Sequence, residues 1–115
     1  MMQLMVLVLN KVECLGQILA SFMENGISGS TVLDSTGMLN AVGHSDVEPP
    51  PIFGSLRKFL RFDEDNNKMV LAVLRDEQVA KASEIVNRIT GGLENPNTGI
   101  LFTVPVLHAE GIVKK

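Results

Sequence analysis

The sequence predicts an α+β fold, because a strand–helix–strand pattern occurs twice along the chain. The first copy occupies residues 4–35 and the second occupies residues 69–104, and the stretch between them, about 36–67, has no regular periodicity. Two βαβ units in one small domain form the split βαβ-βαβ plan of ferredoxin-like folds. We therefore expect a single domain over residues 1–115, with a four-stranded antiparallel sheet, two helices on one face and a long loop at 36–67.

The first unit opens with the apolar run from Leu4 to Leu9, which is typical of a strand buried on both faces or of one that faces a subunit interface. Apolar residues then recur every three or four positions over residues 11–25, which predicts a helix with one apolar face. Asn10 is expected to cap the start of this helix, and Gly26 to end it. A strand over residues 29–35 completes the unit.

The second unit repeats this order. Residues 69–74 form another apolar run and predict the third strand. Asp76 is expected to cap a second helix, which ends at Gly91-Gly92. Residues 100–104 predict the fourth strand, and Pro105 predicts either that this strand lies at an edge of the sheet or that it ends there.

Composition excludes several classes of function. The chain has 115 residues and a net charge of −3, with 10 Lys and Arg against 13 Asp and Glu, and no Trp or Tyr. This balance argues against a nucleic-acid-binding protein, which needs basic clusters and stacking aromatic residues. The only cysteine, Cys14, cannot form an internal disulfide and is expected to be an inert buried thiol in a reducing compartment.

The apolar start of the chain is too short to span a membrane. A membrane-spanning helix needs about 20 apolar residues, whereas polar residues begin at Asn10. A secretory signal would add a basic start and a small-residue cleavage site, which this sequence lacks. We therefore expect a cytoplasmic protein without membrane insertion.

The apolar content predicts an oligomer. The mean hydropathy is +0.22, and the predicted strands are apolar on both faces. In the split βαβ plan the helices cover only one face of the sheet, so the other face needs a second cover. A partner subunit is the simplest one.

The motifs resemble those of the P-II nitrogen-regulatory signalling proteins, and more closely their P-II-like relatives. The resemblance is carried by Gly26-Ile27-Ser28-Gly29-Ser30-Thr31-Val32, by Gly37 at the opening of the long loop, and by Thr98-Gly99-Ile100-Leu101-Phe102-Thr103-Val104-Pro105-Val106. It implies a homotrimer that binds adenine nucleotides or another small ligand in clefts between subunits. It also implies that the loop after the second strand contacts a partner protein and transmits a signal.

The resemblance places the ligand and partner sites on particular residues. The implied ligand-binding residues are Thr31, Gly37, Met38, Asn97, Thr98 and Gly99. We place the partner contact of this loop at His44, Phe53 and Arg57, and the alternative is that the loop phenylalanines pack the returning loop onto the sheet. No obligatory cofactor is expected.

Several cationic positions of typical members are replaced in this chain. Met38-Leu39-Asn40 follows Gly37 where a second glycine and an arginine are usual, and Ile100 follows Gly99 where a lysine is usual. Gly111 and Val113 stand at the positions of two terminal arginines. Because a buried triphosphate needs cations to offset its desolvation, these departures favour a smaller ligand, such as AMP, another nucleotide, bicarbonate or a metabolite.

Two other functions stay open. His44, Asp46 and Glu48 alternate along the loop, so that in an extended chain they point the same way, as in a divalent-metal site of a CutA-like trimer. A small enzyme of ferredoxin-like fold is the second alternative. The sequence has no nucleophile elbow, Walker loop or catalytic triad, so we assign no catalytic residues and expect a non-enzymatic protein.

Overall fold

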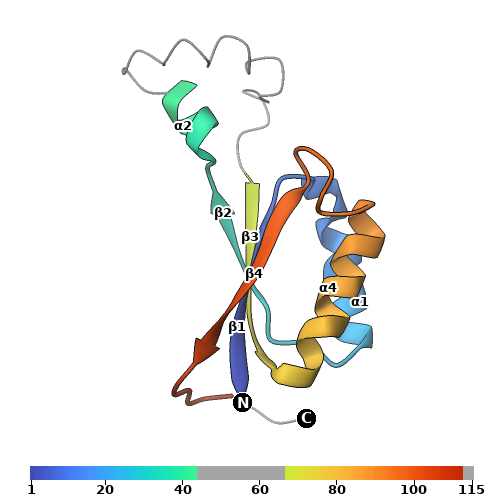
Figure 1. The fold of residues 1–115 in the computed structure, drawn as a ribbon, viewed down its shortest axis with the longest axis vertical. Helices are drawn as coiled ribbons and strands as arrows, with labels where there is room; N and C mark the ends of the chain where they lie inside the picture. Colours follow the sequence, from blue (N-terminus) through green and yellow to red (C-terminus); the bar gives the residue numbers. More distant parts are fainter. Residues whose placement is uncertain (44–66, 113–115) are drawn as a thin grey trace.

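The computed structural model describes residues 1–43 and 67–112, and these form the α+β, ferredoxin-like fold that the sequence predicts (Figure 1). Each βαβ unit contributes one long helix and two strands. The elements in chain order are β1 (Met2–Leu9), η1 (Val12–Cys14), α1 (Leu15–Glu24), β2 (Thr31–Ser35), α2 (Met38–Gly43), β3 (Asn67–Arg75), α4 (Asp76–Thr90) and β4 (Gly99–Val106).

The four strands form one antiparallel sheet in the order β2-β3-β1-β4. The two apolar runs of the sequence, β1 and β3, are the central strands and pair along their whole length, from Met2 opposite Arg75 to Leu9 opposite Lys68. The edges are β2 and β4, which confirms that Pro105 lies in an edge strand. The chain thus places its most apolar strands where both neighbours are strands.

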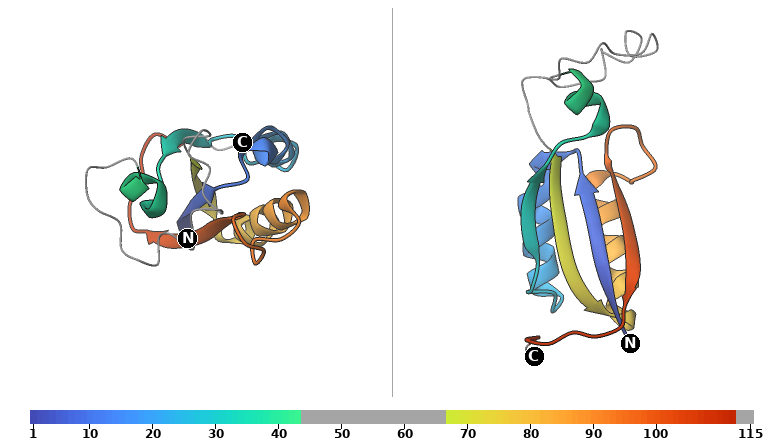
Figure 2. Two further views of the ribbon diagram at one scale, coloured as in Figure 1. Left: turned by 90° about the horizontal axis from the view of Figure 1, so that it is seen from above. Right: turned by 90° about the vertical axis from the view of Figure 1, so that its left-hand side faces the viewer.

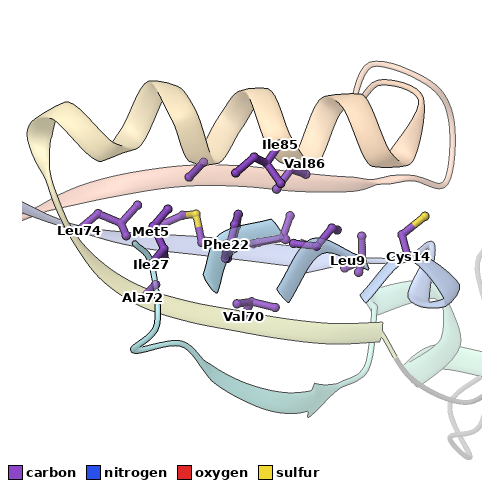
Figure 3. Packing of buried hydrophobic residues seen from close by; sticks show 13 residues of the cluster. Met5, Leu9, Cys14, Phe22, Ile27, Val70, Ala72, Leu74, Ile85 and Val86 are labelled. Atoms are coloured by element: carbon purple, nitrogen blue, oxygen red, sulfur yellow. The ribbon is translucent and has the colours of Figure 1, made fainter. Parts of the chain in front are cut away.

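The core lies between the sheet and the two long helices, which cover the same face (Figures 1 and 3). Alternate residues of β1 and β3 point into it, and Phe22 of α1 and Ile85 of α4 pack against them with no exposed surface. The buried strand residues of this core are Met5, Leu7, Leu9, Val70, Ala72 and Leu74.

The other face of the sheet has no covering element among the described residues, and it turns toward the viewer on the right of Figure 2. The strand register puts apolar side chains along this face, and several are largely exposed, including Ile100 at 64% and Phe102 at 47%. The residues of this uncovered face are Leu4, Val6, Val8, Leu33, Met69, Leu71, Val73, Ile100, Phe102 and Val104. Of the two alternatives predicted for β1, the single chain excludes burial on both faces and leaves a strand with one face toward a subunit interface.

The glycine ends of the helices are confirmed, but the predicted caps at their starts are wrong. Gly26 and Gly91 follow α1 and α4 with φ of 82° and 88°. Asn10 caps neither η1 nor α1, because the chain first makes a short 3-10 turn. Asp76 is the first residue of α4 rather than its cap, and Gln78 instead accepts a hydrogen bond from the backbone N–H of Arg75 at 2.8 Å.

The short helix α2 lies in the region where the sequence shows no periodicity. It has six residues, and the backbone N–H of Ala41 donates to the carbonyl of Gly37 at 2.9 Å. A helix of fewer than two turns is too short to display an apolar stripe, so pattern alone could not predict it. No helix in the described parts of the chain is long and apolar enough to cross a membrane.

Candidate functional site

The predicted ligand residues gather largely at one end of the sheet. Gly99 opens β4 opposite Leu9 of β1, and Leu9 lies opposite Lys68 of β3. Ser35, at the end of β2, lies opposite Asn67, and Gly37 and Met38 follow it directly. The start of α2 and the turn before β4 therefore share this end.

Within one chain these residues nevertheless lie on opposite edges. The strands β3 and β1 separate β2 from β4, and three interstrand spacings amount to about 14 Å. Thr31 is further down β2, opposite Leu71. One small ligand cannot bridge the two edges across the sheet, so the predicted residues do not form a single site in the isolated chain.

The turn before β4 is fixed by backbone contacts. Gly99 has a φ of 154°, and a Cβ added to it would lie 2.6 Å from the carbonyl oxygen of Val8. Asn97 has a φ of 59°, in the left-handed region that asparagine tolerates. Glycine is thus required at position 99 by the close approach of β1, whether or not a ligand binds there.

Thr98 is buried, at 4% exposure, and its polar groups are already engaged. Its carbonyl accepts hydrogen bonds from the backbone N–H groups of Asn10 at 3.0 Å and Lys11 at 3.2 Å, and its hydroxyl donates to the carbonyl of Pro96 at 3.4 Å. This leaves the exposed Asn97 as the residue of the turn whose side chain is open to a ligand.

Lys11 ties this turn to the end of α4. Its ammonium donates to the carbonyl of Thr90 at 3.0 Å, where the last carbonyls of the helix lack intrahelical partners. A cation at a helix carboxyl end is also favoured by the helix dipole. Lys11 therefore holds α4, the start of η1 and the Thr98 turn together.

On the opposite edge the predicted residues are more accessible. Thr31 is exposed and Met38 is 77% exposed, whereas Gly37 is partly buried. A Cβ at Gly37 would approach the Asn67 side-chain amide to 3.3 Å. These residues leave room for contact with another molecule.

The predicted partner-loop residues His44, Phe53 and Arg57 lie outside the described residues, as do the alternative metal ligands Asp46 and Glu48. Within residues 1–43 and 67–112, no three His, Cys, Asp or Glu side chains cluster in a way that could hold a metal ion. Cys14 is buried, and its thiol lies 3.7 Å from the carbonyl of Ile89.

A hollow of about 690 Å³ lies at the opposite end of the sheet. It is bounded by the connection between α1 and β2, the end of β3, the start of α4 and the residues after β4. The lining residues are Met2, Gly26, Ile27, Ser28, Gly29, Ala72, Val73, Leu74, Arg75, Gln78, Gly111 and Ile112. None of them is among the predicted ligand residues.

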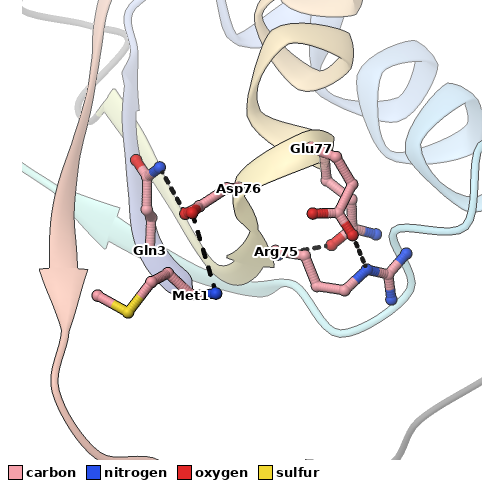
Figure 4. Close-up of polar contacts among 6 residues, drawn as sticks. Met1, Gln3, Arg75, Asp76 and Glu77 are labelled. Carbon is pink, nitrogen blue, oxygen red and sulfur yellow. Dashed lines mark hydrogen bonds and ion pairs between the residues drawn. The ribbon is translucent and has the colours of Figure 1, made fainter.

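Charged and amide groups surround the start of α4 beside this hollow (Figure 4). The Arg75 guanidinium donates through Nε to the Glu77 carboxylate at 2.8 Å. The backbone amide of Glu77 and the Arg75 side chain both lower the pKa of this carboxyl. Gln78 donates to the carbonyl of Gly26 at 3.4 Å, and Asp76 accepts from the Gln3 amide at 2.9 Å.

Known proteins support the fold but do not assign a function. No family model matches the chain. It is 30% identical over 105 residues to a 2-isopropylmalate synthase from Synechococcus sp. (strain CC9311), and the match covers 85% of this chain and 19% of that protein. The chain thus spans less than a fifth of the length of the curated relative that it matches.

Two solved structures are similar over nearly the whole chain. A functionally unknown protein from Pediococcus pentosaceus ATCC 25745 has a TM-score of 0.62 at 13% identity, covering 96% of this chain and 97% of its own. A DUF3240 family protein from Shewanella baltica OS155 has a TM-score of 0.62 at 12% identity, covering 97% of both chains. At these identities the likeness shows the shared fold alone.

The sequence interpretation missed the hollow and the role of Lys11. The motif Gly26-Ile27-Ser28-Gly29 carries the family resemblance without implying a site, and Arg75 has no sequence signal that distinguishes it from other charged residues at a strand end. Lys11 is 79 residues from its partner Thr90. No local pattern could reveal either arrangement, because both depend on how the two βαβ units pack.

Proposed function

We propose that this protein is a non-enzymatic, P-II-like regulatory protein that forms a cytoplasmic homotrimer. It binds a small ligand, a nucleotide or a small anion, in clefts between subunits, and the loop after β2 contacts a partner protein. The observation that carries the proposal is the uncovered apolar face of the sheet, together with the division of the predicted ligand residues between its two edges.

The uncovered face favours self-association. Ten apolar side chains from all four strands lie on it, and the exposed ones include Ile100, Phe102 and Leu33. Exposed apolar surface of this continuity is unfavourable in water, and its burial contributes roughly 25 cal/mol for each Å² removed from solvent. A second copy of the chain offers a matching surface and is always present.

The placement of the ligand residues favours a cleft between chains. Gly37 and Met38 follow one edge strand and Asn97 precedes the other, at the same end of the sheet. In a cyclic trimer two different surfaces of neighbouring subunits meet at each interface, and in the proposed trimer these are the two edges of the sheet. The two half-sites that lie apart in one chain then meet across each interface.

The ligand at such a cleft is expected to be small and weakly charged. Asn40 and Ile100 stand where typical P-II members carry an arginine and a lysine, and Lys11, near the turn, already donates to Thr90. Exposed backbone and the Asn97 side chain can still bind a single anionic or polar group. This supports AMP or a small anion over a triphosphate.

Sedimentation equilibrium at micromolar concentration tests the assembly. The proposal expects a species of three times the 12.5 kDa chain mass. A monomer at these concentrations would contradict it.

Calorimetric titration with AMP, ATP and bicarbonate tests the ligand. A Thr31→Val variant should lose binding and keep the trimer, because it removes one exposed hydroxyl from β2 with little change of shape. Thr103→Val, on the helix-covered side of β4, is the matched control. Absence of heat and of any thermal shift with all three compounds would contradict the proposed ligand classes.

A further inference from the structure

We propose that the hollow beside the start of α4 is a second binding site, which takes a small organic anion with an apolar body. The anionic group pairs with the Arg75 guanidinium, and the apolar body lies against the residues at the ends of β1 and β3. All the lining residues belong to one chain, and one of them, Val73, also lies on the uncovered face of the sheet.

The size and lining of the hollow fit such a ligand. Its volume of about 690 Å³ lies within the roughly 300–1,000 Å³ that is usual for small-molecule sites. The buried residues in its lining are apolar, namely Ile27, Ala72 and Leu74. The lining is otherwise mixed, with polar groups from the connection between α1 and β2 and from the start of α4. Apolar residues bind the body of a ligand in such a site, and polar groups orient it.

Arg75 is the cation of this site. It is exposed, and its Nε is bonded to the Glu77 carboxylate at 2.8 Å. A guanidinium presents five N–H donors in a planar fork, so the Nη groups can pair with a carboxylate or phosphate while Nε is engaged. Glu77 acts as an internal competitor, and an entering anion must share or displace it.

The neighbouring groups give the site its shape. Gln78 accepts from the Arg75 backbone N–H and donates to the carbonyl of Gly26, so it connects the start of α4 to the opposite wall of the hollow. Gly26 and Gly29 have open space where a Cβ would lie. This wall therefore exposes backbone to a ligand without side chains in the way.

The test uses a matched pair of probes, octanoate and 1-octanol, which share an apolar chain and differ in charge. Titration of the ¹⁵N-labelled full chain should shift the amide signals of Gly26 and Gly29 and the side-chain amide of Gln78, and leave Gly99 at the far end unchanged. Octanoate should bind more tightly than 1-octanol. Shifts confined to Ile100, Phe102 and Val104 would place the probe on the uncovered face and overturn the proposal.

Charge variants then test the role of Arg75. Arg75→Gln should weaken octanoate binding about tenfold, the effect of losing one charge-assisted hydrogen-bonded pair, and leave 1-octanol unchanged. Glu77→Gln should strengthen octanoate binding severalfold, because it removes the competing carboxylate. Lys81→Gln, on the exposed side of α4, is the control. Equal octanoate affinity in the wild type and in Arg75→Gln would overturn the assignment, whatever the oligomeric state.

Discussion

The two ends of the sheet differ in how closely their backbone packs and in how their polar groups are bonded. At the end that carries Gly99, backbone groups approach closely and nearly every polar group of the turn has a partner within the chain. At the end that carries Arg75, glycines face open space and a cation is held only by an exposed carboxylate. At the first end the predicted ligand residues lie on opposite edges of the sheet, whereas at the second end one chain forms an open hollow. A match to a family motif therefore indicates where a residue lies in the fold more directly than it indicates that the residue binds a ligand.

The largest expected effect concerns the first end and its need for a second chain. Ile100→Asp places a charge on the uncovered face, at a side chain that is 64% exposed in the single chain. An unpaired charge buried in an interface costs about 3–5 kcal/mol, so sedimentation should show monomers. The folded monomer itself should persist, as judged by circular dichroism. An intact oligomer with Asp at this position would show that the face is not the interface.

The next effect compares glycines at the two ends. Gly99→Ala should destabilise the protein by about 3 kcal/mol, because its Cβ would collide with the Val8 carbonyl in a backbone conformation that disfavours side chains. Gly29→Ala meets nothing within 4 Å and has no positive φ, so its effect should stay within about 0.5 kcal/mol. Urea unfolding measures both. Similar losses of unfolding free energy in the two variants would show that the backbone is no more tightly packed at Gly99 than at Gly29.

Lys11 should show an intermediate effect. Lys11→Met keeps most of the aliphatic chain and removes the ammonium that donates to the Thr90 carbonyl, which should cost about 1 kcal/mol. Amide hydrogen exchange should also become faster at the Thr98 turn, since Lys11 connects this turn to the end of α4. The control Lys81→Met removes an exposed pair with Glu84 and should have little effect on stability. Unchanged exchange at the turn would show that Lys11 does not hold it.

The smallest effect lies at the second end and depends on pH. The pKa of Glu77 is lowered from its usual 4.5, so its ionised form stabilises the folded state at pH values above the unfolded pKa. This contribution is lost as the pH falls through the folded pKa. The unfolding free energies of the wild type and Glu77→Gln should therefore differ above about pH 4.5 and converge below it. If the difference in unfolding free energy stays constant across this pH range, the Glu77 carboxylate is not the source of the pH dependence.

The fold was predictable because its signals are local. The apolar runs at Leu4–Leu9 and 69–74, the helical periodicity between them and the glycine stops at Gly26 and Gly91 each depend on a few neighbouring residues. The two wrong predictions, both of helix caps, also depended on local signals. Asn10 and Asp76 have the side chains of helix caps, but the 3-10 turn before α1 and the Gln78 side chain at α4 provide the actual starts.

The candidate site was predictable only in outline. Gly37 and Gly99, two of the ligand residues that the resemblance implies, lie at the same end of the sheet but next to opposite edges. It did not reveal that Thr98 is engaged within the chain or that Gly99 is required by β1. Hydrogen bonds between segments nearly 90 residues apart leave no periodic trace in a sequence.

The sequence by itself determined the order of the four strands and two long helices, the ferredoxin-like fold and the apolar surplus of the strands, because hydrophobic periodicity and glycine stops act over short distances. The tertiary structure alone decided which face of the sheet stays uncovered, that the predicted ligand residues divide between opposite edges, and that Arg75 stands beside a hollow. Those properties arise from strand order and register. Antiparallel pairing brings together residues that no local pattern connects.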